Sequence, residues 1–171
     1  MKVALVTGAY KGLGLAWSKK LIQEGYEVIL TARNLEQAEN GKMNFSEQDK
    51  LRVYPKALDV SDENQLATLA VWIETKFSQL DLVINNAGIN PKDYSDKSKM
   101  AKAFYLKNLD AEELFQVFKI NSVAPLLVVK HLRSLLIKSE NPKVISISSW
   151  LGSVTNLSFG GHYGYVGSKN L

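Results

Sequence analysis

Short runs of apolar and β-branched residues alternate with longer stretches of helical period along this 171-residue chain. Parallel strands must be joined by crossover segments, which are usually helices, so this alternation predicts a parallel sheet with helices on both faces. The expected fold class is therefore α/β, a doubly wound parallel sheet in three αβα layers. The strands are predicted at residues 2–7, 27–31, 51–58, 82–85 and 144–148.

Capping residues mark the start of two of the predicted helices. Asp62 is followed by Gln65, and Asp110 by Glu113, each at the spacing of a capping box. The helix after the first strand is expected to bury an apolar face. That face consists of Leu13, Ala16, Trp17 and Leu21. Residues 90–108 are polar and rich in lysine, and they are predicted to form a surface excursion.

The composition excludes several classes of protein. Hydrophobic residues make up 46% and charged residues 22% of the chain, as in a globular domain. With no cysteine, the chain has no disulfide framework, thiolate zinc site or iron–sulfur cluster, and no metal is expected. The net charge is +4, and basic and acidic residues are interleaved along most of the chain. This pattern does not indicate a nucleic-acid partner. The absence of cysteine argues against a secreted, disulfide-stabilised scaffold, so a cytoplasmic location is expected. No apolar run approaches the roughly 18 residues of a membrane span.

The number of strands raises the question of where the domain ends. The usual doubly wound order has six strands, whereas five are predicted before the last residue, Leu171. We therefore expect a single domain over residues 1–171 that lacks its C-terminal elements.

A glycine-rich turn follows the first strand directly and opens a helix. Glycine permits a tight turn and lets backbone amides approach a phosphate at the helix N-terminus. The spacing is G-x-x-x-G-x-G, and the Gly-Lys-Ser/Thr of nucleoside triphosphatases is absent. Ordinary turn chemistry is the alternative interpretation. The residues predicted to bind a nucleotide are Gly8, Tyr10, Lys11, Gly12, Leu13 and Gly14.

A basic residue ends the second predicted strand, where an NAD site would have an acidic one. Arg33 stands about twenty residues past the loop, and a guanidinium suits the 2′-phosphate of NADP. Lys11 adds a second positive charge. NADP(H) is therefore predicted in preference to NAD(H), with two ordinary surface bases as the alternative.

Further motifs follow in a fixed order along nearly the whole chain. Asp59-Val60 follows the third strand, Asn85-Asn86-Ala87-Gly88 the fourth and Ser149 the fifth, with Asn121 in the long helix and Tyr165-x-x-x-Lys169 near the end. In this order and context the chain resembles the classical short-chain dehydrogenases/reductases. The glycine-rich stretch before Tyr165 is most similar to the branch of C-factor and sniffer-type carbonyl reductases.

The resemblance implies a Rossmann fold and hydride transfer between a nicotinamide cofactor and a small carbonyl or alcohol substrate. It makes Tyr165 the general acid or base. Lys169, one helical turn on, would lower the pKa of the phenol and bind the nicotinamide ribose. Ser149 would hydrogen-bond the substrate oxygen, and it is preferred to Ser148 because Ser-x-x-Gly continues to Gly152. The resemblance also implies a homodimer or homotetramer.

The remaining predicted site residues come from the loops and from the long helix. Pro125 lies four residues after Asn121 and has no amide hydrogen, so the Asn121 carbonyl is left free. In the family an asparagine here holds a water through this carbonyl, although a simple kink is the alternative. The resemblance assigns adenine contacts to Asp59 and Val60. It assigns the lining of the cofactor to Asn86, Ala87 and Gly88.

Two other functions compete with the enzyme. A regulatory or signalling protein that senses NADP(H) would use the same fold and cofactor site without turnover. The triad of Ser149, Tyr165 and Lys169 argues against it. A basic nucleic-acid binder ranks last, because no groove-entering motif or aromatic interleaving is present.

Overall fold

The computed structural model describes residues 1–153, 155, 158 and 160–170. Contacts divide the chain into two compact units, each of which is described by itself. Met1–Ala87 with Leu127–Ile147 form what we call the sheet unit, and Gly88–Leu126 with Ser148–Leu171 form the helical unit. The single domain predicted from the sequence stays a prediction, and Leu171 lies outside the described residues.

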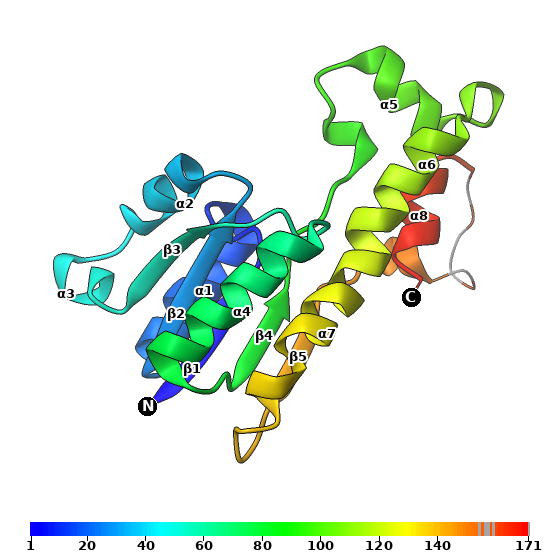
Figure 1. Ribbon diagram of the computed structural model, residues 1–171. Coiled ribbons are helices and arrows are strands. Elements are labelled where there is room, and N and C mark those ends of the chain that lie inside the picture. Colours follow the sequence, from blue (N-terminus) through cyan, green and yellow to red (C-terminus); the bar gives the residue numbers. More distant parts are fainter. Residues whose placement is uncertain (154, 156–157, 159, 171) are drawn as a thin grey trace. The chain divides into compact units, whose positions relative to one another are not determined.

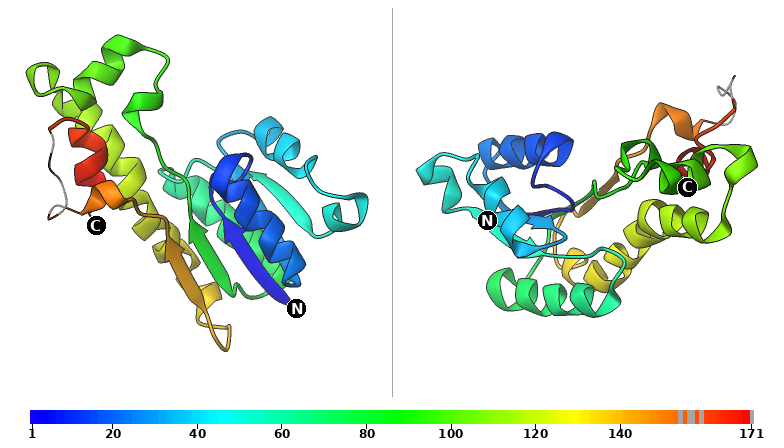
Figure 2. Two further views of the ribbon diagram at one scale, coloured as in Figure 1. Left: turned by 180° about the vertical axis from the view of Figure 1, so that it is seen from behind. Right: turned by 90° about the horizontal axis from the view of Figure 1, so that it is seen from above.

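The sheet unit is built on five parallel strands in the order β3-β2-β1-β4-β5. Helix α1 covers one face, while α4 and α7 cover the other (Figures 1 and 2). The predicted α/β class, doubly wound sheet and three layers are confirmed. The strands are β1 (Lys2–Val6), β2 (Tyr26–Ala32), β3 (Val53–Ala57), β4 (Leu82–Asn85) and β5 (Lys143–Ser146); the helices are α1 (Gly12–Gln23), α2 (Leu35–Lys42), α3 (Glu47–Lys50), α4 (Glu63–Phe77) and α7 (Ala124–Leu136).

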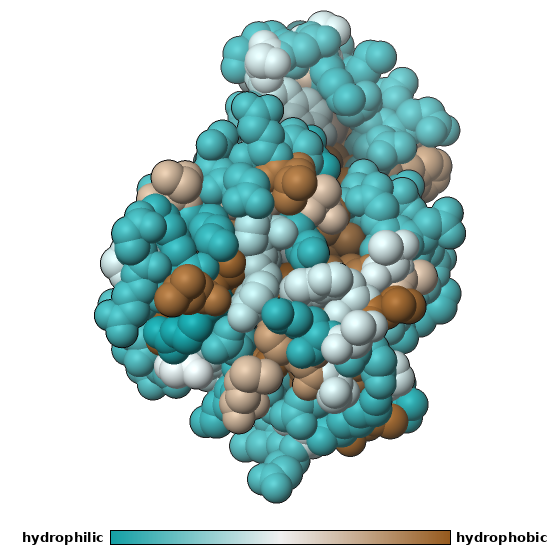
Figure 3. Space-filling model, turned by 60° about the vertical axis from the view of Figure 1, so that its left-hand side comes forward, coloured by the Kyte–Doolittle hydropathy of each residue, from teal (hydrophilic) through white to brown (hydrophobic). Residues whose placement is uncertain are grey.

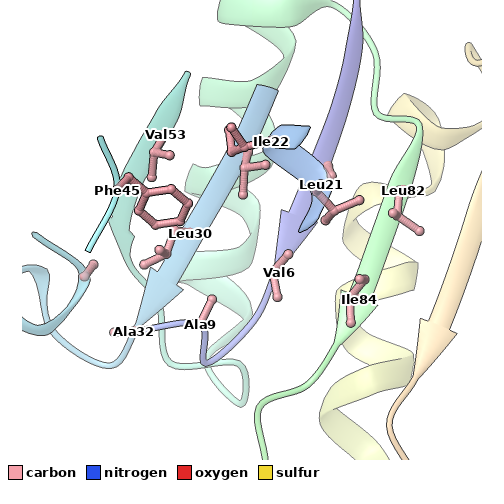
Figure 4. Packing of buried hydrophobic residues seen from close by; sticks show 13 residues of the cluster. Val6, Ala9, Leu21, Ile22, Leu30, Ala32, Phe45, Val53, Leu82 and Ile84 are labelled. Carbon is pink, nitrogen blue, oxygen red and sulfur yellow. The ribbon is translucent and has the colours of Figure 1, made fainter. Parts of the chain in front are cut away.

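The core beneath α1 joins strand and helix side chains. Leu21 and Ile22 pack there with residues of β1, β2 and β4 (Figure 4). The predicted apolar face of α1 is largely wrong, because Leu13 is 52% and Trp17 37% exposed. The buried residues are Gly14, Ser18, Leu21 and Ile22. Small residues at the first two of these positions let the helix axis come close to the loop and the sheet, whereas the large side chains of Leu13 and Trp17 are exposed.

Two predicted strands have different ends in the structure. The third strand begins at Val53, because the N–H of Arg52 closes a turn by donating to the Asp49 carbonyl. The fifth strand ends at Ser146, and all its residues are exposed. Within the described residues β4 alone pairs with β5, so the burial typical of a parallel strand is not reached there.

Both predicted capping residues begin helices. The Asp62 carboxylate accepts hydrogen bonds from the N–H groups of Asn64 and Gln65 at the start of α4. The Asp110 carboxylate accepts one from the N–H of Glu113 at the start of α6 (Ala111–Phe118). The predicted starts of these two helices are confirmed.

The helical unit contains more helix than the sequence predicts. Residues 90–108, expected as a surface excursion, include a helix that Asp96 caps and that packs against α6 and α8. Ala103 of this helix is fully buried. The elements are η1 (Pro91–Asp93), α5 (Lys97–Phe104), η2 (Leu106–Asn108), α6, the π turn η3 (Lys119–Val123), η4 (Trp150–Gly152) and α8 (Tyr163–Ser168).

Hydrophilic residues cover most of the face that Figure 3 shows, and apolar residues lie there in separate patches. Among the described residues, no helix combines the length and the apolar character needed to cross a bilayer. The same part of the chain holds no cluster of three or more histidine, aspartate or glutamate side chains placed to bind a metal ion.

Candidate active site

The glycine-rich turn in the sheet unit links β1 to α1, and its glycines serve two purposes. Gly8 and Gly12 adopt left-handed backbone conformations, with φ of 62° and 58°. Gly14 is required for packing instead. A Cβ at this position would lie 2.5 Å from the Asn86 Nδ2 and 2.8 Å from the Gly8 carbonyl oxygen.

Asn86 and Thr7 hold the turn against the end of β4. The Asn86 side-chain amide donates to the carbonyl oxygens of Thr7 (2.9 Å) and Gly8 (3.0 Å). The backbone N–H groups of Asn86 and Ala87 both donate to the Thr7 Oγ1 at 3.0 Å. Asn86 and Ala87 therefore brace the loop. Thr7 was not among the predicted site residues. The one sequence feature that points to it is a hydroxyl at the end of a buried strand.

Gly41 also shapes the turn and was missed by the sequence reasoning. A Cβ on this α2 residue would lie 2.8 Å from the Tyr10 Cα, so α2 packs directly on the loop backbone. The Lys11 Nζ lies 5.2 Å from the centre of the Tyr10 ring. A glycine within a helical stretch is the signal that points to such a close approach.

Three more predicted residues follow the carboxyl ends of successive strands. Arg33 is exposed directly after β2, and no ion pair among the described residues includes it or Lys11. The Asp59 carboxylate accepts hydrogen bonds from the N–H and the hydroxyl of Ser61. Val60 is buried. The carboxyl ends of parallel strands form one edge of the sheet, where ligands of doubly wound folds bind.

Tyr165 and Lys169 lie one turn apart in the helical unit, on α8 and directly after it. The Lys169 Nζ is 5.9 Å from the centre of the Tyr165 ring, and burial lowers the pKa of Lys169 below its usual value. A Cβ on Gly88 would lie 3.1 Å from the Asn121 Oδ1 and 3.5 Å from the Lys169 Nζ. The structure therefore brings together Gly88, Asn121 and Lys169.

Asn121 lies in the π turn η3, between α6 and α7. The N–H of Ala124 donates to the Lys119 carbonyl, five residues back, and Pro125 has no N–H to offer Asn121. The helix is thus interrupted where Pro125 predicts. The Asn121 Oδ1 accepts from the Ile89 N–H (2.8 Å), and its Nδ2 donates to the Ile89 carbonyl (2.9 Å). This side-chain clamp was not predicted.

The two candidate serines lie beyond the last residue of β5 and have different partners. The Ser149 Oγ accepts a hydrogen bond from the Leu151 N–H at the start of η4. The Ser148 Oγ donates to the Lys169 carbonyl at 3.0 Å. A Cβ on Gly152 would overlap that same carbonyl oxygen. Ser148 and Gly152 therefore fix the Lys169 backbone, and a substrate contact of Ser149 stays a prediction.

His162 precedes α8 and gives a prediction about pH. Its ring centre lies 4.0 Å from that of Phe104, and burial, with a smaller contribution from the charge of Lys92, lowers the pKa of His162 below 6.5. Between that lowered value and about 6.5 the unfolded chain binds more protons, so stability rises with pH through this window. We expect the His162 C2 proton to titrate with a midpoint below 6.5 by NMR.

The chain has two histidines, so the assignment is simple. In a His131→Gln variant one histidine signal remains, and in concentrated urea its midpoint should move up to about 6.5. A folded-state midpoint at or above 6.5 would contradict the prediction.

Comparisons with known proteins agree with this arrangement. The family model of the short chain dehydrogenases matches residues 2–170. (+)-Neomenthol dehydrogenase of Arabidopsis thaliana is 29% identical over 91% of the chain and 56% of its own length. (−)-Isopiperitenone reductase of Mentha piperita is 30% identical over 90% of the chain and 58% of its own length. The crystal structure of a short-chain dehydrogenase from Streptomyces avermitilis superposes with a TM-score of 0.80 at 26% identity, over 99% of this chain and 56% of that one.

The chain spans little more than half the length of these relatives. The family match nevertheless extends through the glycine-rich turn, the Asn-Asn-Ala-Gly segment and the Tyr-x-x-x-Lys segment. The chain belongs to the short-chain dehydrogenase family.

Proposed function

We propose that the protein is an NADPH-dependent oxidoreductase that reduces a small carbonyl compound, or oxidises the corresponding alcohol, with Tyr165 as general acid or base. The observation that carries the proposal is the convergence of Gly88, Asn121 and Lys169 beside the α8 tyrosine. The two relatives named above, a dehydrogenase and a reductase, support the same class of reaction.

The sheet unit fits the phosphates of a dinucleotide. A Cβ on Gly12 would meet nothing within 4 Å, so this glycine leaves the outer side of the loop open to a ligand. The left-handed backbone at Gly8 and Gly12 opens the turn ahead of α1, whose N-terminus favours an anion. Exposed Lys11 and Arg33 add the charge that a 2′-phosphate requires. Asp59 and Val60 are proposed to bind the adenine.

A bound nicotinamide cofactor would supply the hydride. The Tyr165 hydroxyl would give its proton to the carbonyl oxygen of the substrate, and the positive charge of Lys169 would stabilise the phenolate that remains. Ser149 would donate a hydrogen bond to the same substrate oxygen and fix its position. Lys169 would then return a proton to the phenolate and regain one from a water held by the Asn121 carbonyl, to which Pro125 has no N–H to donate.

Binding and turnover test this proposal separately. The full-length protein is titrated with NADPH and NADH, and NADPH oxidation is then followed at 340 nm with a panel of aldehydes, ketones and quinones. Tight NADPH binding with carbonyl-dependent oxidation is expected. Binding without turnover on any panel member would favour the alternative, a regulatory or signalling protein that senses NADP(H). Failure to bind either nucleotide would refute both.

Arg33→Ala is expected to weaken NADPH binding roughly 10- to 100-fold, because a charge-assisted pair with the 2′-phosphate contributes about 1.5–3 kcal/mol. NADH has no such phosphate, so its dissociation constant should change less than about 2-fold. Arg133→Ala on α7, also exposed, is the matched control and should affect neither nucleotide. Equal losses for both nucleotides in Arg33→Ala would contradict the assignment.

We also propose a cytoplasmic homodimer or homotetramer, paired through α6 and the start of α7. Large apolar side chains are exposed on this part of the helical unit, with Phe115 of α6 at 65% and Leu126 of α7 at 68%. Surfaces of this kind are typical of protein contacts. Sedimentation equilibrium of the full-length protein is expected to give at least twice the monomer mass, and a monomer at all concentrations would contradict this expectation.

A further inference from the structure

A buried group of polar side chains in the helical unit connects the π turn η3 to helix α8. Its members are Asn121, Ser122 and Ser168, which are 7%, 5% and 1% exposed. Burying a hydroxyl or amide is unfavourable unless it finds a partner, so each of these side chains must be satisfied within the fold. The sequence motifs account for Asn121 alone.

Ser168 is held at both its side chain and its backbone. Its Oγ donates to the Tyr165 carbonyl at 2.9 Å and accepts from the Asn121 Nδ2, also at 2.9 Å. Its own carbonyl oxygen accepts a hydrogen bond from the Ser122 Oγ at 2.7 Å. The last residue of α8 is therefore joined to two consecutive residues of η3.

The π turn makes this double contact possible. Consecutive residues of an α-helix point about 100° apart, so an α-helical turn seldom directs two neighbours at one partner. Here Asn121 and Ser122 are both buried, while Ile120 before them is partly exposed and Val123 after them is exposed. The one-residue expansion of the turn, which the missing N–H of Pro125 favours, presents both side chains to α8.

Helix α8 depends on such anchors. It has six residues and includes Gly164 and Gly167, and a helix this short is not stable by itself. A Cβ on Gly167 would lie 2.8 Å from the Phe118 ring, so α8 also packs closely on α6. Tyr165 lies within this helix and Lys169 directly follows it. Their positions therefore depend on what holds its last turn.

We propose that Ser168 and Ser122 are positioning residues that fix the last turn of α8 on the π turn and so set the geometry of Tyr165 and Lys169. This proposal rests on the proposed function of those two residues. Ser168 acts through the Tyr165 carbonyl and the Asn121 amide, and Ser122 acts through the Ser168 carbonyl. Neither serine is assigned any contact with substrate.

Ser168→Ala is the central test in the full-length protein. Loss of the hydroxyl leaves the Asn121 amide short of one partner, and kcat for carbonyl reduction should fall roughly 10-fold or more. The KM for NADPH should change less than kcat, because the glycine-rich turn proposed to bind its phosphates lies in the sheet unit. Ser122→Ala is expected to act in the same direction. Ser168→Thr should restore kcat, because a helical threonine can make the same bond to the carbonyl three residues back.

A spectroscopic measurement separates positioning from a general loss of stability. The near-ultraviolet circular dichroism of Tyr165 is obtained as the difference between each protein and its Tyr165→Phe version. We expect the amplitude of this signal to change about 2-fold or more in Ser168→Ala, because the phenol ring changes its orientation when the last turn of α8 loses its anchor. Ser98→Ala, at an exposed position of α5, is the control and should leave both this signal and kcat unchanged.

The outcomes distinguish this proposal from the proposed function. If Ser168→Ala lowers the melting temperature but has the kcat and the Tyr165 circular dichroism of Ser98→Ala, the serine is merely structural and the proposal is overturned. If the wild-type protein has no turnover, the proposed function fails and the circular dichroism of Tyr165 alone decides. A changed signal then supports positioning, and an unchanged signal overturns it.

Discussion

Tyr165→Phe is expected to lower kcat for carbonyl reduction by about 10²- to 10⁴-fold, the usual contribution of a positioned general acid. The substitution removes the hydroxyl and keeps the ring, so α8 retains its packing and the Lys169 ammonium keeps its aromatic neighbour. The dissociation constant of NADPH should stay within about 2-fold, because the glycine-rich turn is in the sheet unit. In the full-length protein, kcat is measured by stopped assays and the dissociation constant of NADPH by a fluorescence titration.

Tyr163→Phe is the matched control for this prediction. Tyr163 begins the same helix and is exposed, and the residue four positions on is Gly167 where Tyr165 has Lys169. Its loss of the hydroxyl should change kcat less than about 2-fold, since no general-acid contribution is removed. Undiminished turnover in Tyr165→Phe, or an equal loss in both variants, would refute Tyr165 as the acid.

The same pair of variants also addresses the competing function. A protein that senses NADP(H) needs the phosphate loop and the basic pair of Lys11 and Arg33, but it has no use for a proton donor. The cluster of Gly88, Asn121 and Lys169 supports the proposed enzyme, because a nucleotide-binding site alone does not require a half-buried lysine beside a tyrosine. If the protein only senses NADP(H), Tyr165→Phe should change nothing except the stability of the protein.

Much of the fold could be predicted because its signals are local. Apolar runs mark the strands, and Asp62 and Asp110 mark helix starts through bonds to residues two or three positions on. The parallel sheet follows from alternation alone. Helix α5 was missed because its lysine-rich sequence shows few apolar positions, and its burial comes from tertiary contacts with α6 and α8.

The interpretation of α1 was wrong for a reason that applies widely. Large apolar residues such as Leu13 and Trp17 suggested the buried face, whereas small Gly14 and Ser18 lie against the protein. A helix that packs closely on a loop backbone needs a small residue at the point of contact. The hydrophobicity of the sequence does not identify such a position. The same holds for Gly41, whose neighbour Tyr10 is distant in sequence.

The residues of the candidate site could be predicted where they lie in one short sequence motif. They could not be predicted where they come from distant parts of the chain. Gly8, Gly12 and Gly14 share one turn, and Tyr165 and Lys169 share one helical turn. Ser122 and Ser168 are 46 residues apart, and they meet because of a π turn that a propensity argument does not predict. Pro125 indicates a break in the helix but not which side chains the break turns inward.

Gly14→Ala is expected to lower the free energy of unfolding by about 3 kcal/mol or more, since overpacking and two displaced hydrogen bonds each contribute. The new Cβ would lie 2.5 Å from the Asn86 Nδ2, 2.8 Å from the Gly8 carbonyl oxygen and 2.9 Å from the Ala9 Cα. Two of these atoms are backbone and cannot turn aside. Moving Asn86 breaks its bonds to Thr7 and Gly8, which shape the turn.

Gly12→Ala separates this packing cost from the general cost of replacing a loop glycine. A Cβ at Gly12 meets nothing within 4 Å, but its φ of 58° is left-handed, so the expected loss is about 1–2 kcal/mol. Thermal melts of the two variants should therefore differ, with Gly14→Ala the lower by roughly 3–8 °C. Equal melting temperatures would mean that the turn relaxes around the new methyl group, and Asn86 would then not be the brace that holds the glycine-rich turn.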